Sequence, residues 1–228
     1  MEKCYPFPNK ANLNIGLLSH PLPEQLQRLY RHYAASISLI DEQIGEIFDA
    51  LENKGYLDDS IIIFTSDHGD CLGEHGHIQK WTMYDCITRV PMIVCAPSRL
   101  DSNIRCDALL QQMDLVPMLF ELAGVQLDDC HSAISALSAL QDEKNGRDIV
   151  FAEYSDNNNM LQGVELMTMA RTREWKLVHY SEQDYGELYD LINDPDEIHN
   201  LWDDCSYANS REEMMEKLST WRRDQNVA

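Results

Sequence analysis

The sequence predicts an α/β fold followed by a small C-terminal antiparallel α+β subdomain. A long helix with apolar residues three and four positions apart comes first. Short apolar runs rich in β-branched residues follow, and such runs are typical of strands buried on both faces of a parallel sheet flanked by helices. From about residue 164, short segments separated by turn residues indicate an antiparallel meander. We therefore expect residues 1–155 to belong to the α/β domain and residues 156–228 to form the subdomain.

The first helix is expected to begin near Pro23, a residue suited to a first helical position, and to end at Gly55 in the C′ manner. Its apolar positions are Leu26, Leu29, Tyr33, Ile37, Ile40, Ile44, Ile47, Phe48 and Leu51. The runs Ile61–Thr65 and Met92–Cys95 then predict two buried strands of the parallel sheet.

Further elements follow from capping residues and from periodicity. Asp114 is expected to cap a short helix over residues 115–123, which Gly124 ends. Residues 149–152 predict another strand of the α/β domain. In the subdomain we expect strands over residues 164–171, 175–180 and 187–190 and an amphipathic helix over residues 210–222.

The charge balance excludes some partners. Thirty-nine acidic and eighteen basic residues give a formal net charge of −21, which repels nucleic acid and anionic membranes, so we expect neither as a partner. No apolar run approaches the ~20 residues of a membrane span. The N-terminus lacks a signal peptide, and seven cysteines without CxxC pairs fit reduced thiols. These features predict a cytoplasmic location, unless a leader belongs to a missing N-terminal region.

The segment that follows the first predicted strand carries the chemistry. Asp67 and His68 come where this strand ends, and the carboxyl ends of strands are where α/β sheets bind ligands. Glycines at positions 69, 73 and 76 allow the loop to wrap closely around a small ligand. A carboxylate beside an imidazole can form half of a metal site, although by spacing alone a structural pair remains the alternative.

This segment resembles the metal-binding loop of the sulfatase family, a branch of the alkaline-phosphatase-like superfamily. The resemblance rests on Thr65-Ser66-Asp67-His68-Gly69-Asp70, on Leu72-Gly73-Glu74-His75-Gly76 and on Lys80. Residues 33–45, 89–93, 114–117 and 187–201 resemble other landmarks of that family in the same order. The resemblance implies an alkaline-phosphatase-like, mostly parallel sheet flanked by helices.

The resemblance also assigns roles to individual residues. It makes Asp67 and His68 ligands of a divalent ion, commonly Ca²⁺ in sulfatases and other ions such as Mn²⁺ in related phosphonate monoesterases. It places Lys80 against the sulfate oxygens, where a cation stabilises the transferring group. His75 and His77 are expected to orient the glycine loop rather than to act in catalysis.

The nucleophile motif of the family does not precede this loop. That motif, Cys/Ser-x-Pro-x-Arg, carries the cysteine that becomes formylglycine, and neither it nor an Asp-Asp pair occurs before Asp67. A literal match, Cys95-Ala96-Pro97-Ser98-Arg99, lies downstream at the end of a predicted strand. It is either a relocated nucleophile or, as we expect, a buried strand cysteine followed by a turn.

We therefore predict the C-terminal half of a sulfuric ester hydrolase, carrying half of a divalent-metal site and inactive alone. The expected substrate is a sulfate ester of a small molecule or glycan. One alternative is a phosphonate or phosphate monoester hydrolase of the same superfamily. The other is a non-catalytic domain that binds a partner, either a missing N-terminal half or further copies of itself.

Overall fold

The computed structural model describes residues 22–127, 132–155 and 164–225, and these fall into two compact units. The unit that we call the sheet unit contains residues 68–89, 147–155 and 164–225. The other, the helix unit, contains residues 22–67, 90–127 and 132–146. The chain thus enters each unit more than once, and the boundary near residue 155 stays a prediction.

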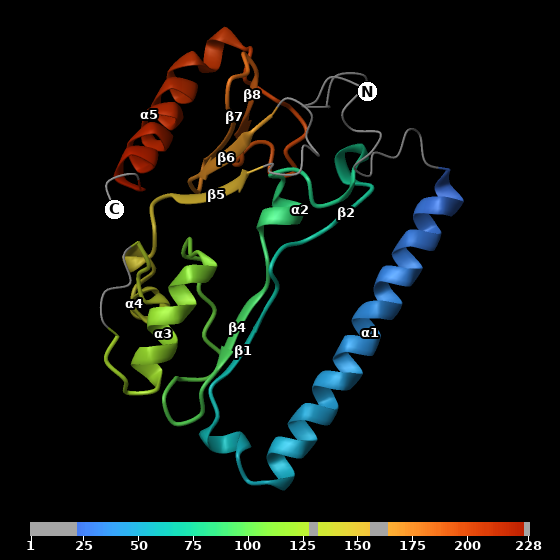
Figure 1. Cartoon of the computed structure of the whole chain (residues 1–228), viewed down its shortest axis with the longest axis vertical. Coiled ribbons are helices and arrows are strands. Elements are labelled where there is room, and N and C mark those ends of the chain that lie inside the picture. The colour runs from blue at the N-terminus through green and yellow to red at the C-terminus, as the bar shows by residue number, and fades with distance from the viewer. Residues whose placement is uncertain (1–21, 128–131, 156–163, 226–228) are drawn as a thin grey trace. The chain divides into compact units, whose positions relative to one another are not determined.

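The sheet unit is built on a four-stranded antiparallel sheet with the strand order β5-β6-β7-β8 (Figure 1). This order is that of a meander, so the predicted antiparallel sheet is confirmed. The sheet also contains β5, which the sequence assigned to the α/β domain, because β5 pairs antiparallel with β6. Its strands and helices are β2 (Cys71–Leu72), β3 (Ile78–Gln79), α2 (Asp85–Thr88), β5 (Val150–Ser155), β6 (Leu166–Arg171), β7 (Trp175–Tyr180), β8 (Gly186–Asp190) and α5 (Ala208–Gln225). Two 3₁₀ turns, Glu74–Gly76 and Cys205–Tyr207, complete the unit.

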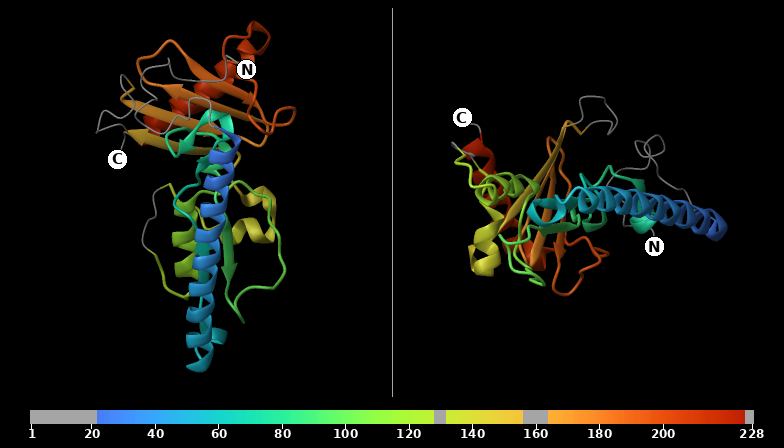
Figure 2. Two further views of the ribbon diagram at one scale, coloured as in Figure 1. Left: turned by 90° about the vertical axis from the view of Figure 1, so that its right-hand side faces the viewer. Right: turned by 90° about the horizontal axis from the view of Figure 1, so that it is seen from below.

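One face of this sheet packs against α5, as Figure 2 shows. Ala170 of β6 and Leu188 of β8 lie in one apolar cluster with Met214 and Leu218 of the helix, and all four side chains are buried. Side chains alternate along a strand, so every second residue of the meander points at α5. The predicted amphipathic helix is therefore confirmed, and it is longer at both ends than its apolar pattern indicated.

The opposite face of the sheet packs against the segment that precedes α2. Met167 and Met169 of β6 and Tyr180 of β7 cluster with Met83, and Trp81 packs against the same cluster. Burial on both faces gives β6 its nearly continuous run of buried residues. The segment at residues 81–84 is therefore part of the core of the sheet unit.

The helix unit begins with α1 (Pro23–Asn53), whose predicted extent is confirmed. Gln25 Oε1 accepts a hydrogen bond from the Leu22 backbone N–H at 2.9 Å, and Gly55 follows the helix in the left-handed conformation with φ +68°. No residue of this helix is buried, and Ile37, Ile40 and Ile47 of its apolar stripe are more than half exposed. Part of the apolar stripe of α1 is therefore exposed.

The rest of the helix unit contains one strand pair and two short helices. Its elements are β1 (Ile62–Thr65), β4 (Met92–Cys95), α3 (Leu115–Leu122) and α4 (Ala136–Gln141), with 3₁₀ turns at Leu57–Asp59, Gln112–Asp114 and Glu143–Asn145. Both predicted strands are confirmed, and Figure 1 shows them side by side. Ile63 and Val94 are register partners on the face that packs against Leu115 and Met118 of α3.

The direction of this strand pair differs from the expectation. β1 and β4 pair antiparallel, with Ile62 opposite Cys95 and Thr65 opposite Met92. A continuous β-branched run indicates that a strand is buried on both faces. It does not indicate whether the neighbouring strand is parallel or antiparallel. The described residues of the chain still combine helices and strands with a small antiparallel sheet, as the predicted α/β class with its subdomain requires.

The expected cap of α3 is also wrong. Asp114 makes no side-chain cap on this helix; instead it is fully buried and accepts hydrogen bonds from the backbone N–H groups of Gln111 (2.8 Å) and Ile134 (3.0 Å). Gln111 directly precedes the 3₁₀ turn Gln112–Asp114, and Ile134 lies 20 positions after Asp114, a contact that sequence periodicity does not show. Gly124 does end the helix, with φ +68°.

None of the helices, over the residues described, combines the length and the apolar character needed to cross a bilayer.

Candidate functional site

His68 and Lys80 are brought together by the short hairpin of β2 and β3. Cys71 pairs with Gln79 and Leu72 with Ile78, so the chain folds back on itself directly after His68. Lys80 Nζ then lies 2.7 Å from His68 Nε2. The predicted metal ligand and the predicted sulfate contact are therefore neighbours in the structure.

The hydrogen bonds of His68 define its tautomer. Its Nδ1 lies 2.8 Å from the Gly69 carbonyl oxygen, which can only accept, so Nδ1 carries the proton. Its Nε2 then carries a lone pair, which accepts from the Lys80 ammonium. An imidazole held this way has the nitrogen lone pair that a metal ion requires.

The turn at Gly69 requires a glycine. Its N–H donates to the Ile87 carbonyl oxygen at 2.8 Å, and a Cβ at this position would lie 1.9 Å from the Cys86 carbonyl oxygen. Any side chain would therefore push the loop away from α2. The glycine fixes the backbone on which the His68 imidazole is mounted.

Asp67 is exposed and follows β1 at the end of the helix unit. Ser66 Oγ lies 3.4 Å from Asp67 Oδ1, and the Ser66 carbonyl oxygen accepts from Gln112 Nε2. The described residues contain no group of three or more His, Cys, Asp and Glu side chains that could hold a metal ion. The donor types of Asp67 and His68 fit a divalent ion, but the described chain supplies only part of a ligand set.

His75 and His77 pack inside the loop. The His75 ring stacks on the buried Tyr84 ring at a centroid distance of 3.7 Å and an interplanar angle of 4°. Burial lowers the pKa of His75, and it lowers that of the buried His77 to about 4, with His75 adding to the effect. Both rings are therefore neutral near pH 7, and the structure gives them a packing role.

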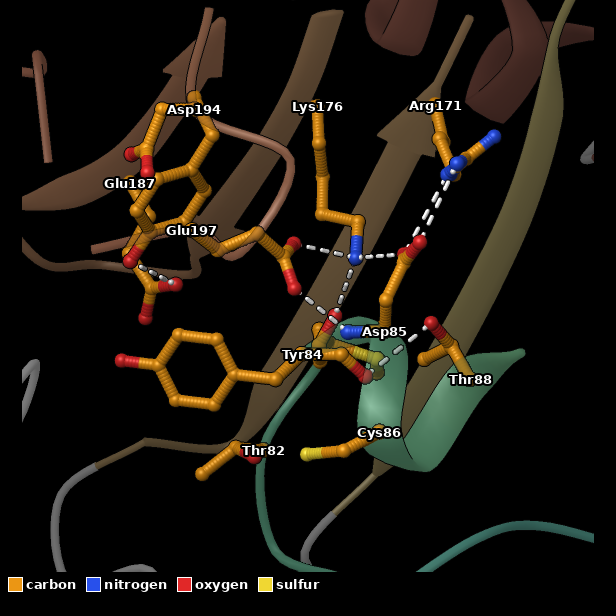
Figure 3. Close-up of polar contacts among 12 residues, drawn as sticks. Thr82, Tyr84, Asp85, Cys86, Thr88, Arg171, Lys176, Glu187, Asp194 and Glu197 are labelled. Atoms are coloured by element: carbon orange, nitrogen blue, oxygen red, sulfur yellow. Dashed lines mark hydrogen bonds and ion pairs between the residues drawn. The ribbon is translucent and has the colours of Figure 1, made fainter. Parts of the chain in front are cut away.

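Four charged residues of the sheet unit form a cluster that we call the ion network: Asp85, Arg171, Lys176 and Glu197 (Figure 3). Lys176 is completely buried; it pairs with Asp85 Oδ1, lies 2.5 Å from Glu197 Oε1 and donates to the Met83 carbonyl oxygen at 3.0 Å. The network therefore joins β6 and β7 to α2 and to the loop that carries Glu197.

Both carboxylates of this network have further hydrogen bonds. Arg171 donates to Asp85 through Nε at 3.3 Å and Nη2 at 3.1 Å, and Glu197 Oε2 accepts from the Asp85 N–H at 2.6 Å. Burial by itself would raise the pKa of Asp85, but Lys176 and Arg171 outweigh it and lower that pKa. In Glu197 burial outweighs the attraction of Lys176, so its pKa is raised.

A second buried carboxylate, Glu187, lies on the same face of the sheet. Tyr180 donates its hydroxyl to Oε1, and the Tyr189 hydroxyl lies 3.0 Å from Oε2. Burial raises the pKa of Glu187 to about 7, although the two phenol hydrogen bonds oppose the shift. Glu187 therefore titrates near neutral pH.

Comparison with protein families decides the classification. The family model "Sulfatase" matches residues 5–125, and the model "N-sulphoglucosamine sulphohydrolase, C-terminal" matches residues 73–224. The chain belongs to the sulfatase family. A curated relative, the N-acetylglucosamine-6-O-sulfatase of Bacteroides thetaiotaomicron, is 30% identical to this sulfatase chain over 200 residues, which cover 84% of the chain and 35% of the relative.

Solved structures share the fold. One, a protein in complex with its substrate D-glucosamine-2-N,6-O-disulfate, has a TM-score of 0.80 and 29% identity, covering 89% of this chain and 42% of its own. Another, the phosphonate monoester hydrolase of Agrobacterium radiobacter, has a TM-score of 0.75 and 27% identity, covering 88% and 42%. The sulfatase chain spans about a third to a half of the length of the curated relatives it matches.

The downstream Cys-x-Pro-x-Arg match of this sulfatase chain lies at a strand end followed by a turn, as expected. Its cysteine, however, is exposed and not buried. Cys95 shares a face of the β1–β4 pair with Phe64 and Ile93, and α3 packs against the other face. Arg99 pairs with Asp59 at 2.6 Å, so its guanidinium has a partner within the helix unit.

Sequence reasoning missed the ion network of the sulfatase chain. Alternation along the strands places Arg171 and Lys176 on one sheet face, and they are register partners. The sequence therefore shows that these two cations share a face. It does not show their partner, because Asp85 lies 91 positions before Lys176. Tyr84 is buried in the core of the sheet unit, and Asp85 belongs to this network.

We predict that replacing Lys176 by methionine destabilises the sheet unit by about 3–5 kcal/mol, because it leaves the buried carboxylate of Glu197 and the half-buried carboxylate of Asp85 without their ammonium partner. All four tryptophans lie in the sheet unit, so urea unfolding followed by tryptophan fluorescence measures this loss. The matched control is Lys217→Met. It removes an exposed pair with Glu213 and is expected to cost less than about 1 kcal/mol. Equal losses in the two variants would contradict the prediction.

We further predict that the stability of the sheet unit contains a pH-dependent contribution from Glu187. The folded state holds the proton up to a pKa of about 7, while the unfolded chain releases it at its ordinary value of 4.5. The free energy of unfolding therefore falls as the pH rises between these values, by at most about 1.4 kcal/mol per pH unit.

The variant Glu187→Gln should flatten this fall, measured by urea unfolding at several pH values in that window. Some slope of the same sign remains from Glu197, whose pKa is also raised. The control Glu213→Gln changes an exposed carboxylate of α5 and should leave the slope as it is. Parallel pH curves for wild type and Glu187→Gln would show that the carboxyl group does not titrate as described.

Proposed function

We propose that this chain is part of a sulfuric ester hydrolase in which Asp67 and His68 hold a divalent ion and Lys80 contacts the sulfate group. The observation that carries the proposal is the 2.7 Å contact between Lys80 Nζ and His68 Nε2. It occurs in a chain of the sulfatase family, within the loop whose sequence resembles the metal-binding loop of that family.

His68 would hold the ion through the Nε2 lone pair that now accepts from Lys80, and Asp67 would contribute its carboxylate. The ion, when bound, supplies positive charge that polarises the ester and stabilises negative charge developing on its oxygens. Ca²⁺ is the ion expected from the resemblance. Mn²⁺ is the alternative, since an imidazole ligand suits a transition-metal ion better than it suits Ca²⁺.

Lys80 would donate hydrogen bonds from its ammonium group to the sulfate oxygens. Because the net charge of the chain is −21, an anionic substrate meets a repulsive field except near such local cations. Lys80 is exposed at the end of β3, so its ammonium is accessible to a ligand.

The substrate class that we propose is a sulfate ester of a sugar. It is supported by the relative named N-acetylglucosamine-6-O-sulfatase and by the structure bound to D-glucosamine-2-N,6-O-disulfate. The match to the C-terminal model of N-sulphoglucosamine sulphohydrolase points to the same class.

A phosphonate or phosphate monoester hydrolase is the second candidate. The structural match to the phosphonate monoester hydrolase of Agrobacterium radiobacter supports it, at 27% identity, and so does the imidazole of His68 as a ligand for ions such as Mn²⁺. A sulfate monoester carries one negative charge and a phosphate monoester nearly two, so the complete ligand set would decide between them.

The third candidate is a non-catalytic domain. Ile37, Ile40 and Ile47 of α1 are exposed along one stripe, and a stripe of this kind gains stability when it is covered. The cover could be a missing N-terminal half, supplied separately, or further copies of the chain.

We predict that the chain binds Mn²⁺ at His68, and only weakly. Mn²⁺ should broaden the amide NMR signals around His68 and Lys80, and His68→Ala should abolish that broadening. The control His199→Ala removes an exposed histidine of the same unit and should leave it unchanged. Since Ca²⁺ prefers six to eight oxygens, calorimetry giving a Kd below about 1 μM for Ca²⁺ would contradict a partial site.

We also predict that this chain alone does not turn over an aryl sulfate or an aryl phosphonate with Ca²⁺ or with Mn²⁺. The physical reason is that no Cys/Ser-x-Pro-x-Arg nucleophile motif precedes Asp67 in the sequence. Metal-dependent turnover would overturn the half-site proposal. Cys95→Ala would then show whether the downstream motif supplies the nucleophile.

A further inference from the structure

Two cysteine thiols face each other beside the candidate site. Cys71 begins β2 and Cys86 lies in α2, and their Sγ atoms are 3.1 Å apart. Cys71 is completely buried, whereas Cys86 is half-buried. Figure 3 shows Cys86 projecting from α2 away from Lys176, so this thiol is separate from the ion network.

The backbone, and not the sulfur contact, holds these two thiols in place. Gly69 donates its N–H to the Ile87 carbonyl oxygen at 2.8 Å, which ties the start of the loop to α2 next to Cys86. Asp85, the residue before Cys86, is fixed by Lys176 and Arg171. The loop and α2 are therefore held together by contacts other than the one between the sulfur atoms. An S–S bond of about 2.05 Å requires the two Sγ atoms to approach by only about 1 Å.

We propose that Cys71 and Cys86 form an intramolecular disulfide when the chain meets a small disulfide oxidant such as oxidised glutathione. The half-buried Cys86 thiolate attacks a glutathione sulfur and releases one glutathione thiol. Cys71 then attacks Cys86 Sγ and releases the second. The two protein thiols lose two electrons and two protons, and one glutathione disulfide becomes two glutathione thiols.

The bond would close a loop whose ends are 15 positions apart and which contains Lys80. It would fasten the β2–β3 hairpin covalently to α2 and so restrict the segment that presents the Lys80 ammonium to His68. The five described cysteines are free thiols, so the structure represents the reduced state. The hydrogen bond with Cys71 and burial raise the pKa of the Cys86 thiol, so the first attack is expected to be slow at neutral pH.

The test incubates the full chain with oxidised glutathione, denatures it, alkylates the remaining thiols and maps the peptides by mass spectrometry. We expect two of the seven thiols to be lost and one peptide that links Cys71 to Cys86. The linked form should unfold at a higher Tm than the reduced form. Reduction should return both thiols and the lower Tm.

Variants separate this pair from general oxidation. Cys86→Ser should abolish the linked peptide, while Cys205→Ser, which changes an exposed cysteine of the same unit, should leave it at the wild-type yield. The proposal is overturned if Cys71 and Cys86 stay alkylatable, or if glutathione is found only as adducts on exposed cysteines such as Cys95 and Cys205. The peptide map of the oxidised wild-type chain tests the proposal even if a variant misfolds. This test does not depend on any hydrolase activity.

Discussion

The buried ammonium of Lys176 is the constraint on which the sheet unit depends. A charge without solvent must be neutralised locally, and here Asp85 and Glu197 do this from two different segments. Because Asp85 starts α2, the pairing fixes this helix against the sheet. Gly69 contacts α2 through the Ile87 carbonyl oxygen, so the position of the His68 loop follows from a charge buried under the sheet.

In the sheet unit, the residues that stabilise the fold are therefore different from the residues of the candidate site. Lys176 and Glu187, the buried charged residues of its strands, both have partners and lie on the sheet face that packs against the segment before α2. The exposed and half-buried groups, Lys80 and His68, lie at the end of the hairpin that this face supports. A rigid scaffold beneath a glycine-rich loop is the usual way in which ligand-binding side chains are positioned.

Family membership and substrate depend on different kinds of observation. Membership rests on family models that match most of the chain, with motifs in order from the first helix to the C-terminal turn. Substrate choice depends on the complete ligand set and on pocket walls, of which Asp67, His68 and Lys80 are a part. The sugar sulfate that we propose therefore rests on the relatives, and the His68–Lys80 contact supports only the charge chemistry.

The sequence by itself determined the elements and the family. Apolar periodicity defined α1, continuous apolar runs defined β1 and β4, and turn residues separated the strands of the meander. The motif around Asp67 and His68 identified the loop. These signals are local, because each depends on residues a few positions apart. Tertiary structure alone decided the antiparallel direction of β1 and β4, the buried role of Asp114 and the pairing of Asp85 with Lys176. Each of those joins residues about twenty or more positions apart, and no local pattern encodes which distant group will satisfy a buried charge or a strand edge.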